Sequence, residues 1–364
     1  MIKKIIVFLL KWVNIPLVVI TLLAYLTPYI SPNDFWGLSL LGLGFPILLA
    51  GNALFFILFA MIRHKMALLS LFCVLLGWGY VTNFISYNTI DINHSDKHIS
   101  VMSYNIRRFN FRSINYDYIE QRISSQKKGF QVINQYQPSI VCGQEFYNFN
   151  QKINKSSKHK AIYEHLLNMV RTTYPYFEIK GSKTILSKFP IINKGEFKNQ
   201  TYVYCLWVDI QLDNKTNIRV YNVHLSSNQI SPVTEKLEIT EETIKDKSTT
   251  DAIKQVVRMY RDKVKIRANE AEEIVEHIKG SPYPVIVAGD FNDPILSYAN
   301  HQFLSVLKDA FQEKGNGIGT TYRGNIPFLR LDRVYVSPSL KVLDFKTIDH
   351  DYSDHNPIFT TLKY

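Results

Sequence analysis

The sequence predicts a mixed α/β domain preceded by three membrane-spanning helices. Three observations support this fold class. Three long apolar stretches stand in the first quarter of the chain, short β-rich runs alternate with helical stretches over the rest, and several of those runs end in Asn, Asp, Glu or His. We therefore expect a membrane anchor over residues 1–86, a linker over 87–98 and a catalytic domain over 99–364.

The anchor is predicted from the length of its apolar stretches, which are Trp12–Tyr29, Leu38–Ile62 and Met66–Ile85. Each holds about 18 to 25 residues, which is enough for a helix to cross a hydrocarbon core of about 30 Å. Buried helices of a soluble protein are the alternative, and the first stretch alone would also suit a signal peptide. No small-residue cleavage site lies in that stretch before Pro28, so we expect an uncleaved anchor.

The basic residues predict the orientation of the anchor. Lys3, Lys4 and Lys11 precede the first stretch, and two more basic residues lie in the second short loop, whereas the first loop, Thr27–Trp36, has no Lys or Arg. Because short cytoplasmic loops are enriched in Lys and Arg, the N-terminus is expected in the cytoplasm. Three crossings would then place the catalytic domain outside it, in the periplasm if the chain sits in a bacterial inner membrane.

The catalytic domain is expected to contain both strands and helices. Its clearest helix is Asp251–Lys279, where apolar residues recur at helical spacing. The polar segment Leu225–Thr250 before that helix suits either a mobile flap over the site or a solvated insertion. The predicted strands are Ile99–Tyr104, Ser139–Cys142, Thr184–Leu186, Tyr202–Gln211, Ile218–Val223, Val285–Ala288 and Arg333–Val336.

Candidate functional residues stand where these strands end and loops begin, which is where active sites are built. The motifs that carry them are SYNIRRFN from Ser103, IVCGQEF from Ile140, YNVHLSS from Tyr221, VIVAGDFNDP from Val285, LDRVYVS from Leu331 and YSDHNPIF from Tyr352. Taken one by one, Asn105 could be a turn residue, His224 an ordinary strand-end histidine, and the arginines near the motifs solvated surface. Their joint occurrence in one domain favours a site.

These motifs resemble those of the endonuclease/exonuclease/phosphatase superfamily with the DNase I-like fold, from about Ile99 to the end of the chain. The resemblance implies a four-layer α/β sandwich, in which two packed mixed sheets are flanked by helices. It also implies that Glu145 is the principal Mg²⁺ ligand and that Asn105 and His224 belong to the site. The remaining matches are Asp290 and Asn292 in the GDxN motif, Asp332 before the penultimate strand, and Asp354 with His355 in the closing SDH.

The chemistry of phosphoester hydrolysis fits the same residues. A phosphate ester repels nucleophiles, so its hydrolysis needs a cation, a base for water and an acid for the leaving oxygen. Hard oxygen ligands, with Glu145 and Asp354 as the metal-binding pair, favour Mg²⁺ or Mn²⁺. The expected catalytic residues and roles are Asp290 as base, Asn292 as support for Asp290 or the phosphate, His355 paired with Asp332 on a phosphoryl oxygen, and His224 as general acid.

The sequence leaves the substrate open. Asn105, Arg108 and Arg333 are the expected substrate-binding residues, since arginine grips phosphate through paired hydrogen bonds. The formal charge of +11 suits a nucleic acid or a phospholipid headgroup as partner, and no obligate protein partner is evident. The alternatives are a lipid-directed phosphoesterase of the sphingomyelinase or phosphoinositide type, and a non-catalytic binding protein on this fold. LDRV at Leu331 only partly matches the inositol phosphatase loop, because that loop has Cys in place of Leu331.

Overall fold

The computed structural model describes residues 2–88, 97–114, 118–146, 157–200, 202–228, 247–324 and 329–364. Most of the predicted linker 87–98 and of the predicted loop Leu225–Thr250 lies outside these ranges. The chain forms two compact units, each built from separated segments. The first unit is Met1–Asn83, Ser226–Glu272 and Asp293–Gln302, and the second is Phe84–Leu225, Glu273–Asn292 and Phe303–Tyr364.

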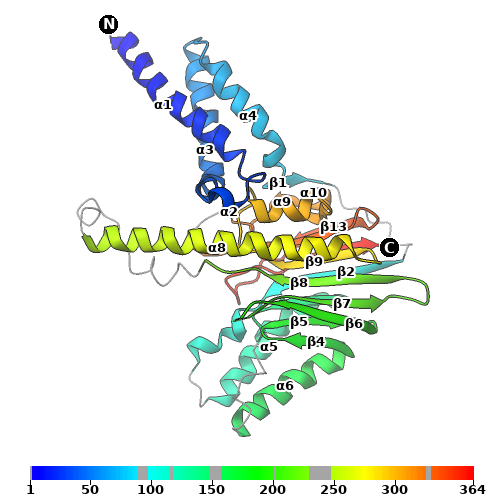
Figure 1. The fold of residues 1–364 in the computed structure, drawn as a ribbon. Helices are drawn as coiled ribbons and strands as arrows, with labels where there is room; N and C mark the ends of the chain where they lie inside the picture. Colours follow the sequence, from blue (N-terminus) through cyan, green and yellow to red (C-terminus); the bar gives the residue numbers. More distant parts are fainter. Residues whose placement is uncertain are drawn as a thin grey trace. The chain divides into compact units, whose positions relative to one another are not determined.

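The first unit contains three apolar helices that pack on one another (Figure 1). Polar side chains join them inside the bundle, because Asn14 donates to Ser70 at 2.8 Å and Asn52 donates to Thr21 at 2.8 Å. Such buried polar pairs are a common means of holding helices together in an apolar environment. The helices are α1 (Ile2–Ala24), the short α2 (Pro32–Phe35), α3 (Gly37–Met61) and α4 (Ala67–Val81).

Two of these helices, and not the expected three, are long and apolar enough to cross a membrane by length and composition. The qualifying segments are Val7–Ala24 and Gly37–Met61. The third expected span, Met66–Ile85, forms only the 15-residue helix α4, which at about 1.5 Å per residue is about 22 Å long. The end of that stretch is a strand instead: β1 (Ile85–Tyr87) pairs with β11 (Asn316–Ile318), and both strands belong to the second unit. The backbone there is engaged in a sheet, so the helix ends before it.

The long helix α8 (Lys247–Lys279) belongs to the first unit as far as Glu272. Its Tyr260 hydroxyl donates to the Ser39 carbonyl oxygen at the start of α3, at 2.9 Å. The segment Asp293–Gln302 of the same unit also packs closely on α3. A methyl group added at Gly42 of α3 would lie 2.3 Å from the Leu296 carbonyl oxygen. Two segments of the predicted catalytic domain therefore pack with the apolar helices.

The second unit contains two six-stranded mixed sheets, with strand orders β10-β12-β9-β8-β7-β6 and β13-β14-β2-β3-β5-β4. In each sheet one central pair is parallel, β8 with β9 and β2 with β3. The strand bounds are β2 (His98–Asn105), β3 (Ile140–Gln144), β4 (Tyr176–Lys180), β5 (Lys183–Ser187), β6 (Ile191–Lys198), β7 (Val203–Gln211), β8 (Asn217–His224), β9 (Val285–Asp290), β10 (Lys308–Asp309), β12 (Asp332–Val336), β13 (Lys341–Thr347) and β14 (Ile358–Lys363).

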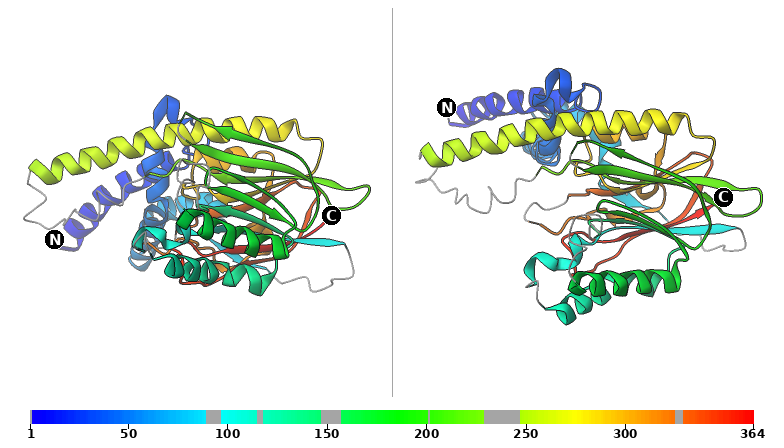
Figure 2. Two further views of the ribbon diagram at one scale, coloured as in Figure 1. Left: turned by 90° about the horizontal axis from the view of Figure 1, so that it is seen from below. Right: turned by 60° about the horizontal axis from the view of Figure 1, so that its bottom comes forward.

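The two sheets pack face to face, with helices on their outer faces (Figure 2). One apolar cluster lies between the sheets and draws on both of them, with Val101, Ile185, Val208 and Val334 among its members. A second cluster packs the outer face of the β2 sheet under α5 (Ile119–Tyr136) and α6 (Ser157–Thr173). This confirms the predicted α/β fold with two mixed sheets flanked by helices. The remaining elements are the 3-10 turn η1 (Arg107–Ser113), α9 (Tyr298–Leu304) and α10 (Ala310–Lys314).

Candidate active site

The site is built at one end of the two sheets, where the parallel pairs bring strand ends together. In the β8–β9 pair His224 lies opposite Asp290, and Asp332 at the start of β12 lies opposite Asp290 from the other side. In the other sheet Asn105 ends β2 opposite Gln144, the residue before Glu145. The carboxyl ends of parallel strands meet at the same sheet edge, so polar residues placed there converge.

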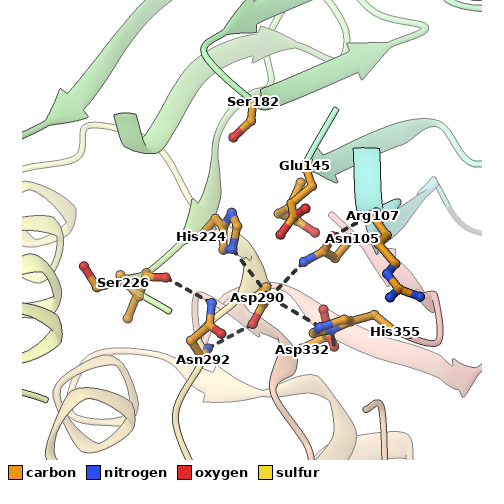
Figure 3. A network of polar contacts seen from close by, with 12 residues as sticks. Asn105, Arg107, Glu145, Ser182, His224, Ser226, Asp290, Asn292, Asp332 and His355 are labelled. Atoms are coloured by element: carbon orange, nitrogen blue, oxygen red, sulfur yellow. Dashed lines mark hydrogen bonds and ion pairs between the residues drawn. The ribbon is translucent and has the colours of Figure 1, made fainter. Parts of the chain in front are cut away.

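Asp290 lies at the centre of the residues drawn in Figure 3, where dashed lines join it to Asn105, His224, Asn292 and His355. Its Oδ2 accepts a hydrogen bond from the Asn105 amide at 3.0 Å, and its Oδ1 accepts one from the backbone N–H of Asn292 at 2.9 Å. The side chain of Asp290 is 1% exposed, and the nearest histidine nitrogens, of His224 and His355, are 3.7 and 3.8 Å from its Oδ2. The carboxylate is thus oriented by donors on both oxygens.

His355 is paired with Asp332, as the sequence predicts. Its Nδ1 lies 2.8 Å from Asp332 Oδ2, and both side chains are buried. Burial on its own would lower the pKa of His355, but the Asp332 and Asp290 carboxylates outweigh that effect and raise the pKa to about 10. His355 is therefore an imidazolium cation at neutral pH, suited to bind a phosphoryl oxygen.

His224 differs from the expectation that its imidazole titrates near neutrality. Burial, reinforced by the nearby Lys183 ammonium, lowers the pKa of His224 to about 3 against the opposing effect of Asp290. The ring is consequently neutral at pH 7 and carries one N–H. This corrects the expected role: in the free protein His224 can donate a hydrogen bond, but it does not hold the extra proton that a general acid delivers.

Glu145 and Asp354, the predicted metal ligands, each have an arginine beside them. Arg108 Nε lies 3.5 Å from Glu145 Oε2, and Arg107 Nε lies 3.5 Å from Asp354 Oδ2. Both arginines project from a left-handed turn, with φ of 50° at Arg107 and 53° at Arg108, while their side chains are more than half exposed. Burial raises the pKa of Glu145, with the Arg108 charge opposing this. A second cation beside Glu145 would stabilise its charged form further.

The residues present fit a hard divalent cation. Ligand atoms of Asp290, Asp332 and His355 lie within 4.8 Å of one another. Among the described residues, Asp332 Oδ1 is a buried carboxylate oxygen without a hydrogen-bond partner, and burying such an atom is costly unless a donor or a cation compensates it. The protonated His355 cannot itself be a ligand, so the atoms available to a cation are carboxylate oxygens, which suit Mg²⁺ or Mn²⁺.

Two predicted residues take other positions than expected. Asn292 supports Asp290 through its backbone, while its side-chain amide donates to the Leu225 carbonyl oxygen at 3.0 Å. Arg333 is 1% exposed, and its guanidinium donates to the Arg330 carbonyl oxygen at 2.7 Å. Because adjacent strand residues point to opposite faces, Arg333 lies on the outer face of its sheet while Asp332 faces the site. The structure does not bring Arg333 to the other predicted residues.

A buried polar network under the site was not predicted from the sequence. The Gln144 amide donates to Asn222 Oδ1 at 2.7 Å, and the Asn222 amide donates to the carbonyl oxygens of Gly143 and Thr184 at 2.9 and 2.8 Å. Gln144 also contacts the Ser103 hydroxyl. These bonds join the two sheets below Asn105, Glu145 and His224. The available signal was that Ser103, Gln144 and Asn222 are polar residues inside otherwise apolar strands, one or two positions before a site residue.

Comparison with known proteins agrees with this arrangement. Residues 102–355 match the Endonuclease/Exonuclease/phosphatase family, and residues 3–84 match a domain of unknown function. No curated protein matches the chain.

Several solved structures are similar to the chain. An endonuclease/exonuclease/phosphatase from Bacteroides vulgatus is 17% identical, with 73% of this chain and 99% of that one covered and a TM-score of 0.49. A mannosyl-6-phosphatase of Bacteroides thetaiotaomicron is 19% identical, with 73% and 100% covered and a TM-score of 0.46. TDP2 from Caenorhabditis elegans is 17% identical, with 74% and 75% covered and a TM-score of 0.48.

The family match spans more than half of the chain and all ten residues that the sequence analysis singled out. The motifs, the two packed sheets and the cluster around Asp290 agree with it. The chain belongs to the endonuclease/exonuclease/phosphatase family and is a phosphoester hydrolase.

Proposed function

We propose that the protein is a membrane-anchored, divalent-metal-dependent phosphoesterase. The observation that carries this proposal is the Asp290 carboxylate, held by the Asn105 amide and the Asn292 backbone and flanked by a charged and a neutral histidine. A carboxylate with fixed donors, next to a cationic group, can orient water in line with a phosphoryl group.

Each residue contributes a separate part of the reaction. Asp290 orients and deprotonates the attacking water. The His355 imidazolium, kept charged by Asp332, stabilises a phosphoryl oxygen, and the neutral His224 donates a hydrogen bond to a second one. The exposed side chain of Arg108 binds the phosphate from outside. Glu145 and Asp354 would hold Mg²⁺ or Mn²⁺, which when bound neutralises negative charge on the substrate.

The test uses the full-length protein in detergent, with bis(4-nitrophenyl) phosphate and 4-nitrophenyl phosphate as substrates. Turnover should disappear in EDTA and return with Mg²⁺ or Mn²⁺. Asp290→Asn should lower kcat on the order of 10²-fold or more, because a positioned base is lost. Glu276→Gln, whose side chain is 77% exposed, is the matched control and should keep its activity. Full turnover in EDTA, or an active Asp290→Asn variant, would contradict the proposal.

We further propose that the substrate is a phosphoester of a nucleic acid or a phospholipid headgroup. The exposed arginines Arg107 and Arg108 at the site support an anionic substrate. A screen over DNA, RNA, sphingomyelin and phosphoinositides distinguishes the nuclease from the lipid-directed alternative. Hydrolysis of uncharged esters, with none of these phosphoesters turned over, would refute the assignment.

The proposed location is a bacterial inner membrane, with the N-terminus in the cytoplasm and the catalytic unit outside. The lysines in the first half of α1 support this orientation, which also requires that the short helix α4 completes a third crossing. Fusion of alkaline phosphatase to the C-terminus tests it, because that enzyme is active only outside the cytoplasm. An inactive fusion together with an active cytoplasmic reporter would place the catalytic unit in the cytoplasm and refute this orientation.

A further inference from the structure

Two segments that leave the active site are held by one buried arginine of α8. Arg267 is 0% exposed. Its Nε donates to Asp293 Oδ1 at 3.0 Å, while its Nη1 donates to the Ser226 carbonyl oxygen at 2.9 Å and to Asn228 Oδ1 at 2.7 Å. All four residues belong to the first compact unit. One guanidinium therefore bonds to two separate segments of the chain.

Glu270, one turn further along α8, also holds the segment that contains Ser226. Its carboxylate accepts hydrogen bonds from the Ser226 backbone N–H at 2.9 Å and from the Ser226 hydroxyl at 3.0 Å. Arg267 and Glu270 stand three residues apart, so they lie on neighbouring turns of one helix face. We call Arg267 and Glu270 together the α8 clamp.

Both clamped segments lie next in sequence to residues of the proposed active site. Ser226 follows His224 by two positions, and Asp293 directly follows Asn292. Asn292 has a left-handed backbone, with φ of 51°, and its N–H holds the Asp290 carboxylate. Asparagine adopts this conformation more readily than other non-glycine residues, and its N–H orients Asp290 only while the loop keeps that conformation.

Burying a charged guanidinium is costly unless its donors and its charge are compensated. An apolar side chain would fill the same position on α8 without that cost. The guanidinium of Arg267 offers several N–H donors in a fixed geometry, which an apolar side chain lacks. These donors reach acceptors in two loops at once. This is the observation that favours positioning over simple packing.

We propose that the α8 clamp is a positioning device that holds the loops after His224 and Asn292 in their catalytic geometry. The inference rests on the proposed function, because it assigns a role toward that active site. A displacement of about 1 Å in a catalytic group can lower the rate about 10²-fold. Loosening these loops should therefore reduce kcat more than it weakens substrate binding.

The experiment compares Arg267→Met and the milder Asp293→Asn with Arg219→Met in the full-length protein. Arg219 is a matched control because it forms another buried ion pair, with Asp209 at 2.6 Å, and has no part in the proposed site. The readouts are kcat and KM for bis(4-nitrophenyl) phosphate, melting temperature, and hydrogen exchange of residues 222–228 and 290–296.

Arg267→Met and Asp293→Asn should lower kcat on the order of 10-fold or more at nearly unchanged KM and speed exchange in both segments. Arg219→Met should lower the melting temperature while kcat stays unchanged. Unchanged kcat in both clamp variants, or an equal loss of kcat in Arg219→Met, would overturn the inference. The proposed function fails if the wild-type protein hydrolyses neither bis(4-nitrophenyl) phosphate nor 4-nitrophenyl phosphate. In that case, unchanged hydrogen exchange in the clamp variants would separately exclude the clamp.

Discussion

His224 and His355 carry the same side chain and flank the same carboxylate, yet their surroundings give them different charges. His355 has Asp332 at 2.8 Å, and its pKa is raised to about 10. His224 is buried near Lys183, and its pKa is lowered to about 3. Pairs of titratable groups whose pKa values are pushed apart in this way commonly divide the tasks of an active site. At neutral pH one ring is a cation and the other a neutral hydrogen-bond donor.

This separation predicts that Asp332 and His355 act as a unit. Asp332→Asn removes the negative charge that keeps His355 protonated, so kcat should fall on the order of 10²-fold, and His355→Asn should cost about as much. The double variant should then be little worse than either single variant, because each single change already removes the cationic group. The measurement is a double-mutant cycle on kcat with bis(4-nitrophenyl) phosphate. Losses that multiply in the double variant would show that the two residues act independently.

A third histidine predicts how stability depends on pH. His277 Nδ1 forms a hydrogen bond with the Tyr221 hydroxyl at 2.8 Å, and its ring packs on Trp207. Burial, together with the Arg219 charge, lowers the pKa of His277. In the unfolded chain the pKa of His277 is about 6.5. As the pH falls, the unfolded state therefore protonates His277 at a higher pH than the folded state does. The contribution of neutral His277 to stability is present above about pH 6.5 and is lost below it.

In His277→Gln the melting temperature of the full-length protein should consequently fall less between about pH 7.5 and pH 5.5 than in the wild type. Lys279→Gln, an exposed change on the same helix, is the control and should keep the wild-type pH dependence. An equal fall in wild type and His277→Gln would mean that His277 is not among the groups that set the acid sensitivity.

At the level of single residues, the sequence predicted the site where a residue type and its place at a strand end agree. Asn105, Asp290 and Asp332 were expected at strand termini, and the structure places them there. Arg333 was misplaced because adjacency in sequence was taken for proximity, although strand alternation turns it to the other face from Asp332. The left-handed backbone of Glu145 could not be predicted, because tertiary contacts fix it and no glycine or asparagine marks that position.

Among the elements, the parallel pair β8–β9 matters most for the site, since it sets His224 opposite Asp290. The two strands approach closely at Gly289, where a methyl group would lie 1.9 Å from the Val223 carbonyl oxygen. The glycine is thus required by the neighbouring backbone. The strands themselves could be predicted from their β-branched runs, but their pairing could not, because residues far apart in sequence form it.

Gly289→Ala should therefore destabilise the protein by about 1 to 3 kcal/mol or more and shift the β8–β9 register. Because His224 and Asp290 end these strands, kcat should fall as well, by about 10²-fold for a displacement of about 1 Å. The control is Gly280→Ala, where a methyl group would lie 3.7 Å from the His277 carbonyl oxygen, an ordinary contact. Melting temperature and kcat are measured for both. A Gly289→Ala protein as stable and as active as Gly280→Ala would disprove the close approach.

At the scale of the whole molecule, composition and contacts divide the chain differently. Composition separates an apolar N-terminal part from a mixed α/β part, and the two sequence matches, over residues 3–84 and 102–355, follow that division. The compact units do not, because Ser226–Glu272 and Asp293–Gln302 group with Met1–Asn83. Hydropathy reports which residues are apolar, but it cannot show that Tyr260 of α8 bonds to Ser39 of α3.

This grouping predicts what happens when residues 1–83 are removed. Residues 247–272 would lose partners in the first unit, such as the acceptor of the Tyr260 hydroxyl and Asn33, which donates to Asn269 at 2.7 Å. Strands β2 and β9, whose partners lie in the second unit, would keep theirs. Hydrogen exchange should therefore quicken over 247–272 and 293–302 in the shortened protein while β2 and β9 stay protected. The full-length protein in the same detergent is the control. Unchanged protection over 247–272 would show that these segments are stable without the apolar helices, and uniform loss of protection would show that the whole fold depends on them.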